Sequence, residues 1–281
     1  MEVENTMKKT VFIIVVILLL IAFGVSAFMV GSYVLESRQQ AQRREELAQM
    51  AAAATSPSTE ATTEPDATQA STETTEAAET TEATEPTELT ILPVCEVYHT
   101  ENSDTVGYLE IPGTKLANPV MQTPNDPNYY LKHDFDKNYS DWGAVYAWGS
   151  ADLTAPSDNV TLFGHTMKDG SMFACLHNYY QESYWEDNRL ILFNTLYKEH
   201  VYKIYAVFEV SANIGEFAYH QFVDAATEEE FNDFVDTCKA KSFYDTGITP
   251  VYGDKLLTMS TCTYTPGLDN GRLVVCAVRM Y

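Results

Sequence analysis

The sequence predicts a mostly β domain with short helices, closed into a barrel and preceded by a transmembrane helix and a disordered linker. Residues 11–30 form one uncharged apolar run, and residues 51–90 are almost entirely Ala, Thr, Glu, Ser and Pro. After residue 91, short apolar segments alternate with turn-forming residues, and few segments have helical spacing. Short strands at this density, with few helices, are typical of a closed or partly closed barrel.

The apolar run VFIIVVILLLIAFGVSAFMV, residues 11–30, is long enough to cross a bilayer as a helix. A cleaved signal peptide is the alternative, with Val25-Ser26-Ala27 as its cut site. Signal peptides usually have a shorter apolar stretch than this one. We therefore expect an uncleaved membrane anchor.

The charges beside the anchor bear on its orientation. Lys8 and Lys9 favour a cytoplasmic N-terminus over residues 1–10, but three arginines follow the anchor within residues 31–50. Charge alone therefore leaves the orientation open. Residues 31–50 end in ESRQQAQRREELAQM, a composition that favours a juxtamembrane helix continuous with the anchor.

Residues 51–90 contain nine acidic residues and no Lys or Arg. Such a segment buries too little apolar surface to offset its ordering entropy, so we expect a disordered linker. As a flexible coil, forty residues span about 35 Å on average. The composition suits a spacer between a membrane and a working domain, or a tether with no further role.

The remaining residues, 91–281, form one predicted domain with 12 Lys and Arg against 26 Asp and Glu, a net charge of −14. An acidic surface argues against nucleic acid as a partner, because that affinity depends on basic contacts to phosphate. It is compatible with a partner that carries amines. The sequence has no metal-binding motif and predicts no cofactor.

Eight segments of the domain have strand-like patterns. They are residues 105–111, 115–121, 144–148, 159–163, 190–194, 199–210, 255–261 and 272–280. In the sixth, alternation places Tyr202, Ile204, Ala206, Phe208 and Val210 on one face. The eighth is apolar throughout its middle, which predicts a central strand covered on both sides.

Two helices are predicted within the domain. Thr227 and Glu230 form a capping-box pattern that starts a helix over residues 227–241, with Cys238 on its apolar face. A shorter helix is expected over residues 171–180. We expect Cys238 to be a core residue.

The domain has five cysteines and no CxxC pair, so a zinc or thioredoxin-type site is not indicated. Cys262 ends the strand-like segment 255–261, and Arg272 begins the next strand after the loop TYTPGLDNG. In an antiparallel hairpin these two residues face each other, and a guanidinium favours the thiolate form of a cysteine. The alternative is a small buried cysteine in the core.

A thiol nucleophile needs a proton-transfer partner. His165 ends the segment NVTLFGH, where a strand runs into a glycine, and it is the preferred candidate. His133 is its rival. His177 lies on the predicted short helix. The remaining three histidines lack a strand-end setting: His99, His200 and His220.

The sequence resembles the sortases, and among them class B, over residues 98–281. The family signature TLxTC is present as TMSTC, ending at Cys262, and the signature arginine is Arg272 in NGRLVV. The segments NVTLFGHTMKDGSMFACLHNY, VGYLEIPGTKLANPVMQ and NYYLKHDF also match the class B pattern. Thr263 is a departure, because many class B members have an acidic residue after the cysteine.

This resemblance implies a sortase-like closed β-barrel and a cysteine transpeptidase. It implies Cys262 as nucleophile, His165 as proton shuttle and Arg272 as oxyanion stabiliser, with the Thr263 backbone N–H as a second donor. Substrate contacts are expected from Ser260, Leu131 and Thr263. The segment 211–224 should shape the binding groove, with candidate contacts at Phe217, Ala218 and Tyr219.

The resemblance also implies partners and a location. The enzyme would cleave a sorting signal, NPQTN-like or LPXTG-like, on secreted proteins and transfer the acyl-threonine to a peptidoglycan amine or to a pilin lysine. It would be a single-pass membrane protein with the N-terminus inside and the domain outside. Two other hypotheses remain: an inert surface domain with the same barrel, and a cysteine protease that uses water.

Overall fold

The computed structural model of the protein describes residues 2–55 and 89–280. The chain divides into two compact units, Met1–Met50 and Ala51–Tyr281. Most of the predicted linker, residues 56–88, lies outside the described residues.

The helix α1 (Glu2–Thr55) accounts for the first unit and continues a few residues beyond it, and it contains the predicted anchor and the predicted juxtamembrane helix. Within the described part of the chain it is the candidate membrane span, by length and composition, and its apolar segment has no buried residues. The helix ends at Thr55, five residues after the predicted boundary, because the alanines that follow Met50 are strong helix formers.

Within the second unit, α2 (Pro93–Glu101) precedes the barrel, and the sequence did not indicate this helix. Its first helical residue is a proline. The backbone N–H at this position makes no intrahelical hydrogen bond, so a proline is tolerated there. Cys95 and Tyr98 are buried, and the helix packs on the first strand of the barrel.

Eight strands form a closed barrel in the order β1-β2-β3-β4-β7-β8-β6-β5, which confirms the predicted fold class. The strands are β1 (Thr105–Glu110), β2 (Ala117–Met121), β3 (Val145–Ala147), β4 (Asn159–Phe163), β5 (Leu190–Thr195), β6 (Val201–Ser211), β7 (Leu256–Cys262) and β8 (Gly271–Arg279). The pairs β2–β3 and β4–β7 are parallel, and the other pairs are antiparallel. All eight strand-like segments of the sequence are strands.

Short helices occupy the connections. They are the 3₁₀ helices η1 (Tyr129–Leu131), η2 (Phe173–Tyr180) and η3 (Tyr219–Gln221), and the α-helices α3 (Glu182–Asp187) and α4 (Glu228–Lys241). The predicted cap of α4 is confirmed, because the Thr227 side chain accepts a hydrogen bond from the Glu230 N–H. The predicted helix at 171–180 is present as the 3₁₀ helix η2.

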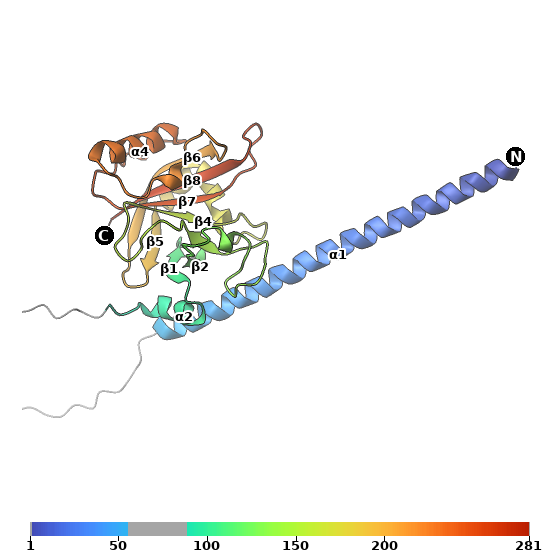
Figure 1. Ribbon diagram of the computed structural model, residues 1–281, viewed down its shortest axis with the longest axis horizontal. Helices are drawn as coiled ribbons and strands as arrows, with labels where there is room; N and C mark the ends of the chain where they lie inside the picture. The colour runs from blue at the N-terminus through green and yellow to red at the C-terminus, as the bar shows by residue number, and fades with distance from the viewer. Residues whose placement is uncertain (1, 56–88, 281) are drawn as a thin grey trace, which may run out of the picture. The chain divides into compact units, whose positions relative to one another are not determined.

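Two apolar clusters flank the central strand β8. Leu273, Val275 and Ala277 belong to the cluster inside the barrel, while Val274 and Cys276 pack with α4 outside it. Figure 1 shows α4 lying beside β6 on the outside of the barrel. The prediction of a strand covered on both sides is confirmed. Cys238 is fully buried on the core-facing side of α4, as expected.

The face assigned to the sixth strand from the sequence is wrong in part. A register shift between Ile204 and Ala206 interrupts its pairing with β8. Such a bulge adds one residue and reverses the alternation. Ile204 therefore packs inside the barrel, whereas Ala206 and Phe208 pack with α4.

Candidate active site

The hairpin formed by β7 and β8 brings Cys262 and Arg272 together. The two residues are Cα partners in the last rung of this antiparallel pair, as the sequence predicted. Cys262 is half-buried, and the Arg272 Nη1 donates to the carbonyls of Asn270 (3.2 Å) and Gly271 (3.0 Å). These bonds hold the guanidinium at the end of the sheet.

His165 reaches the same end of the sheet through β4. This strand is parallel to β7, with Phe163 paired to Ser260. The C-terminal ends of both strands therefore lie at the same end of the barrel. The Nε2 of His165 lies 2.8 Å from the carbonyl oxygen of Leu131. A carbonyl can only accept, so Nε2 carries a proton in this arrangement.

Cys262, His165 and Arg272 line one cavity of about 280 Å³. The other lining residues are Asn128, Leu131, Tyr146, Trp148, Phe163, Gly164, Ala212, Tyr219, His220, Ser260 and Thr261. The cavity therefore combines a thiol, an imidazole and a guanidinium with an aromatic wall. This composition fits nucleophilic attack on a bound peptide in a partly dry site.

Two tyrosines of the wall remain protonated phenols. Burial raises the pKa of Tyr146 well above its usual value, although the nearby Arg272 charge opposes this effect. Burial also raises the pKa of Tyr219, whose hydroxyl lies 2.6 Å from the Ser260 hydroxyl. Arg272 lines the same cavity as both tyrosines, and its charge opposes the effect of burial on the pKa of each phenol.

Two of the three predicted substrate-contact residues line the cavity, and the third does not. Leu131 and Ser260 line the cavity. The Thr263 side chain instead donates to Glu209, and its N–H donates to the carbonyl of Gly271 at 3.0 Å. The expectation that the Thr263 amide is an oxyanion donor is wrong for this arrangement, because the β7–β8 pairing already uses that amide.

Of the groove candidates in segment 211–224, Tyr219 lines the cavity, while Phe217 packs against Phe234 of α4 at 5.8 Å between ring centroids. Ala218 is not among the lining residues. His220, which the sequence did not favour, does line the cavity and packs edge-on against Trp148.

The rival histidine, His133, lies elsewhere. Its ring stacks on Tyr129 at a centroid distance of 3.9 Å, and its Nδ1 bonds to the Tyr129 carbonyl. It is absent from the cavity lining. Of the two candidate histidines, His165 therefore lines the cavity with Cys262 and His133 does not.

A family model of the sortase domain matches residues 109–280, more than half of the chain. The chain belongs to the sortase family.

Curated relatives and solved structures specify the class. Sortase B of Staphylococcus aureus is 25% identical over 185 residues, which cover 66% of this chain and 74% of that protein. Sortase B of Listeria monocytogenes is 26% identical over 174 residues, covering 62% and 69%. These similarities assign the protein to the class B sortases.

The solved structures agree with this class. The S. aureus sortase B–substrate complex has a TM-score of 0.61 at 25% identity, covering 68% of this chain and 86% of that one. Sortase B from Bacillus anthracis in complex with AAEK1 has a TM-score of 0.59 at 26% identity, covering 67% and 85%. The barrel is therefore a sortase B fold.

The other four cysteines of this sortase are buried free thiols. Burial raises the pKa of Cys95 to about 12, with a further contribution from Glu199. Burial also raises the pKa of Cys175. Because all five cysteines lie in the described residues, Cys262 is the thiol of this chain that solvent reaches most readily.

The aromatic wall of the cavity was not predicted from the sequence. Tyr146 and Trp148 lie on and just after β3, and Phe163 ends β4. Tyr146 and Phe163 stack at 5.4 Å between centroids across this antiparallel pair. Strand alternation puts both on the outer face, but local sequence does not show which outer face carries the cavity.

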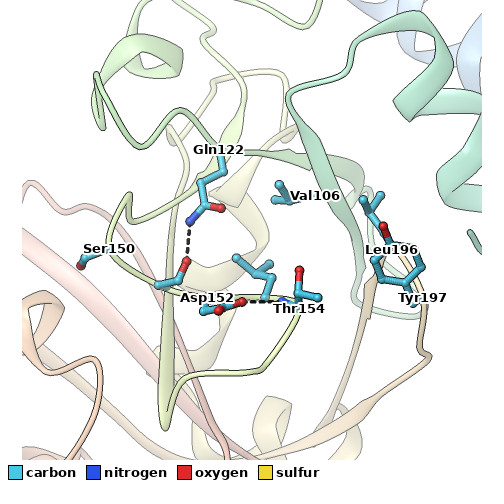
Figure 2. A pocket seen from close by; sticks show the side chains of 9 residues that line it. Val106, Gln122, Ser150, Asp152, Thr154, Leu196 and Tyr197 are labelled. Carbon is cyan, nitrogen blue, oxygen red and sulfur yellow. Dashed lines mark hydrogen bonds between the residues drawn. The ribbon is translucent and has the colours of Figure 1, made fainter. Parts of the chain in front are cut away.

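A second cavity, of about 340 Å³, lies between other loops of the barrel. Figure 2 shows that Gln122 and the loop of Asp152 and Thr154 contribute to it. Gln122 donates to the carbonyls of Trp148 (3.0 Å) and Ala151 (2.7 Å), and the Asp152 side chain accepts from the Thr154 N–H at 2.7 Å. These bonds hold the loop, and none of the proposed catalytic side chains lines this cavity.

Replacing Gly143 with alanine should disturb His165. Gly143 has φ +56°, and an added Cβ would lie 2.5 Å from the Tyr130 carbonyl oxygen and 3.2 Å from the His165 Cδ2. The backbone that holds the imidazole must then shift, so we expect kcat/KM for peptide cleavage to fall by about 10-fold.

The matched control for this change is Gly253→Ala. Gly253 has φ +98°, but an added Cβ would meet no atom within 4 Å, so this variant carries backbone strain without a clash. Both variants should lose about 1–3 kcal/mol of stability, measured by thermal unfolding. Equal kcat/KM in the two variants would contradict the role assigned to this contact.

Proposed function

We propose that this sortase cleaves a C-terminal sorting signal of secreted proteins and transfers the acyl-threonine to an amine of peptidoglycan. The observation that carries the proposal is the single cavity that joins Cys262, His165 and Arg272 from three strand ends. The S. aureus relative whose structure is described as a substrate complex supports a peptide in this cavity.

The chemistry follows from the three groups. His165 takes the proton of the Cys262 thiol, the Sγ attacks the scissile carbonyl carbon, and the C–N bond breaks to leave a thioester. Arg272 donates hydrogen bonds to the carbonyl oxygen as negative charge develops on it. His165 gives a proton to the leaving amine, then takes one from the incoming amine, which displaces the thiol.

We infer the proton-transfer atom from the tautomer of His165. Nε2 is bonded to the Leu131 carbonyl, so Nδ1 is the nitrogen that exchanges the proton. The Leu131 carbonyl stabilises the imidazolium form during the reaction, because it accepts from Nε2 whether Nδ1 is protonated or not. Leu131 therefore has two roles: it lines the cavity, and its carbonyl orients the imidazole of His165.

The chain organisation supports a membrane location. Residues 11–30 would cross the membrane with residues 1–10 inside, and residues 51–90 would separate the catalytic domain, 91–281, from the bilayer. Protease added to intact cells without their wall should release the domain. Complete protection of the domain would contradict this orientation.

The test of the activity is a panel of peptides incubated with and without an added amine. NPQTN-like and LPXTG-like peptides separate the two signal classes, and a glycine peptide, a stem-peptide amine and a lysine peptide serve as acceptors. We expect cleavage in one signal class and a product joined to the amine.

Each alternative gives a different result in this panel. Preference for the lysine peptide would indicate pilin polymerisation rather than wall attachment. A product that ignores every amine would indicate a protease that uses water. No cleavage, together with no selective labelling of Cys262 by a thiol reagent, would indicate an inert domain.

A further inference from the structure

A cluster of hydroxyl groups surrounds Glu209 on the face of the β7–β8 hairpin opposite the cavity. We call Tyr180, Glu209, Thr263 and Thr265 the Glu209 cluster. The Glu209 Oε1 accepts from the Tyr180 hydroxyl (2.5 Å), the Thr263 hydroxyl (2.6 Å) and the Thr265 hydroxyl (2.5 Å). Tyr180 also lies 2.8 Å from the Thr263 oxygen.

The carboxylate is ionised in this setting. Burial acts to raise the pKa of Glu209, but the bonds from Thr263, Thr265 and Tyr180 and the nearby His177 hold it below its usual value. Hydrogen bonds to a charged acceptor are stronger than neutral ones. Glu209 therefore ties three elements together: β6, the end of η2 and the loop after β7.

The cluster sits directly behind the nucleophile. Thr263 follows Cys262, and successive residues of a strand point to opposite faces. Cys262 lines the cavity, while Thr263 is 7% exposed and faces Glu209. The Thr263 N–H donates to Gly271, the residue before Arg272.

The same short helix also supports the histidine side. His177 of η2 lies 3.0 Å from the Thr166 hydroxyl, which lies 2.8 Å from the Thr261 hydroxyl. Thr166 follows His165, and Thr261 precedes Cys262. Through Tyr180 and His177, η2 thus holds the chain next to both reacting side chains.

We propose that Glu209 is a positioning residue for transpeptidation, which holds Cys262 and Arg272 in register from behind the hairpin. This inference rests on the proposed function of the cavity. Glu209 does not line the cavity, so its effect passes through Thr263 and Thr265. Without the carboxylate, the loop TYTPGLDNG would be free to move and would displace the Sγ of the adjacent Cys262. This loop has positive φ at Gly267 and Asn270.

The test compares Glu209→Ala, Thr263→Val and their double variant with Glu186→Ala as a matched control. Glu186 is an exposed glutamate of α3. We expect each single variant to lower kcat by about 10-fold with KM within about 2-fold, because a displacement of the nucleophile affects the reaction more than binding. The double variant should lose no more than either single variant.

An exchange variant provides the rescue. Glu209→Thr combined with Thr263→Glu keeps one carboxylate and one hydroxyl in contact, so kcat should return to within about 3-fold of the unmodified enzyme. A purely structural role would lower the melting temperature without this pattern. Additive losses in the double variant, or unchanged kcat in Glu209→Ala, would overturn the proposal.

A substrate-independent readout separates this inference from the proposed function. The rate at which a small methanethiosulfonate reagent modifies Cys262 should change in Glu209→Ala and Thr263→Val, and return in the exchange variant. If the reagent reacts with Cys262 of the wild-type enzyme but the enzyme cleaves no peptide, the proposed function fails. The modification rates of the variants still test the positioning role in that case. If cleavage occurs and neither kcat nor modification rate changes, the positioning role fails.

Discussion

Replacing Cys262 with alanine is expected to abolish cleavage of every sorting peptide, with kcat lowered by at least about 10³-fold. The sulfur is the group that would form the thioester, and no other cysteine is as accessible as this half-buried thiol. The fold should remain, because Cys262 lines a cavity rather than the packed core. Mass spectrometry of peptide products, with circular dichroism for the fold, checks both parts.

The control for this variant is Cys95→Ala. Cys95 is fully buried beside β5, with its thiol 3.4 Å from the Thr195 carbonyl. Its loss should lower the melting temperature and leave kcat near that of the unmodified protein. Cleavage by Cys262→Ala at the original rate would exclude the thioester mechanism.

Replacing Arg272 with alanine should lower kcat/KM by about 10²–10³-fold. Arg272 shares the last rung of the hairpin with Cys262 and lines the same cavity, so we expect its guanidinium to donate to the substrate carbonyl oxygen. Arg272→Lys should recover only part of the loss, because an ammonium is a point charge without the planar fork of the guanidinium. Steady-state peptide kinetics measure both variants.

A second arginine on the same strand provides the control. Arg279 lies at the opposite end of β8 and pairs with Tyr202 of β6. Arg279→Ala should leave kcat/KM within about 2-fold, since screening removes its influence at that separation. Similar losses for both arginines would show that strand stability, rather than oxyanion stabilisation, explains the Arg272 effect.

Local patterns were sufficient to predict the strands. Each of the eight segments has an alternating or continuous apolar pattern bounded by turn formers, and these signals depend on neighbours in sequence. The cap of α4 was also predictable, because Thr227 and Glu230 are three residues apart. The hairpin that pairs Cys262 with Arg272 followed from two adjacent strands and a short loop.

Other features had no adequate local signal. The bulge in β6 arises from its pairing with β8, so alternation alone placed Ala206 and Phe208 on the wrong side relative to Ile204. The helix α2 has only two buried residues and a proline start. The parallel pairing of β4 with β7 joins segments almost 100 residues apart.

The sequence by itself predicted the order of anchor, linker and barrel, and it nominated Cys262, His165 and Arg272 as the reacting groups. Only the tertiary structure decided that these three side chains share one cavity, and that the Thr263 amide is bound to Gly271. The physical reason is range. Spacing and propensity act between near neighbours, whereas the convergence of β4 with the β7–β8 hairpin depends on barrel closure.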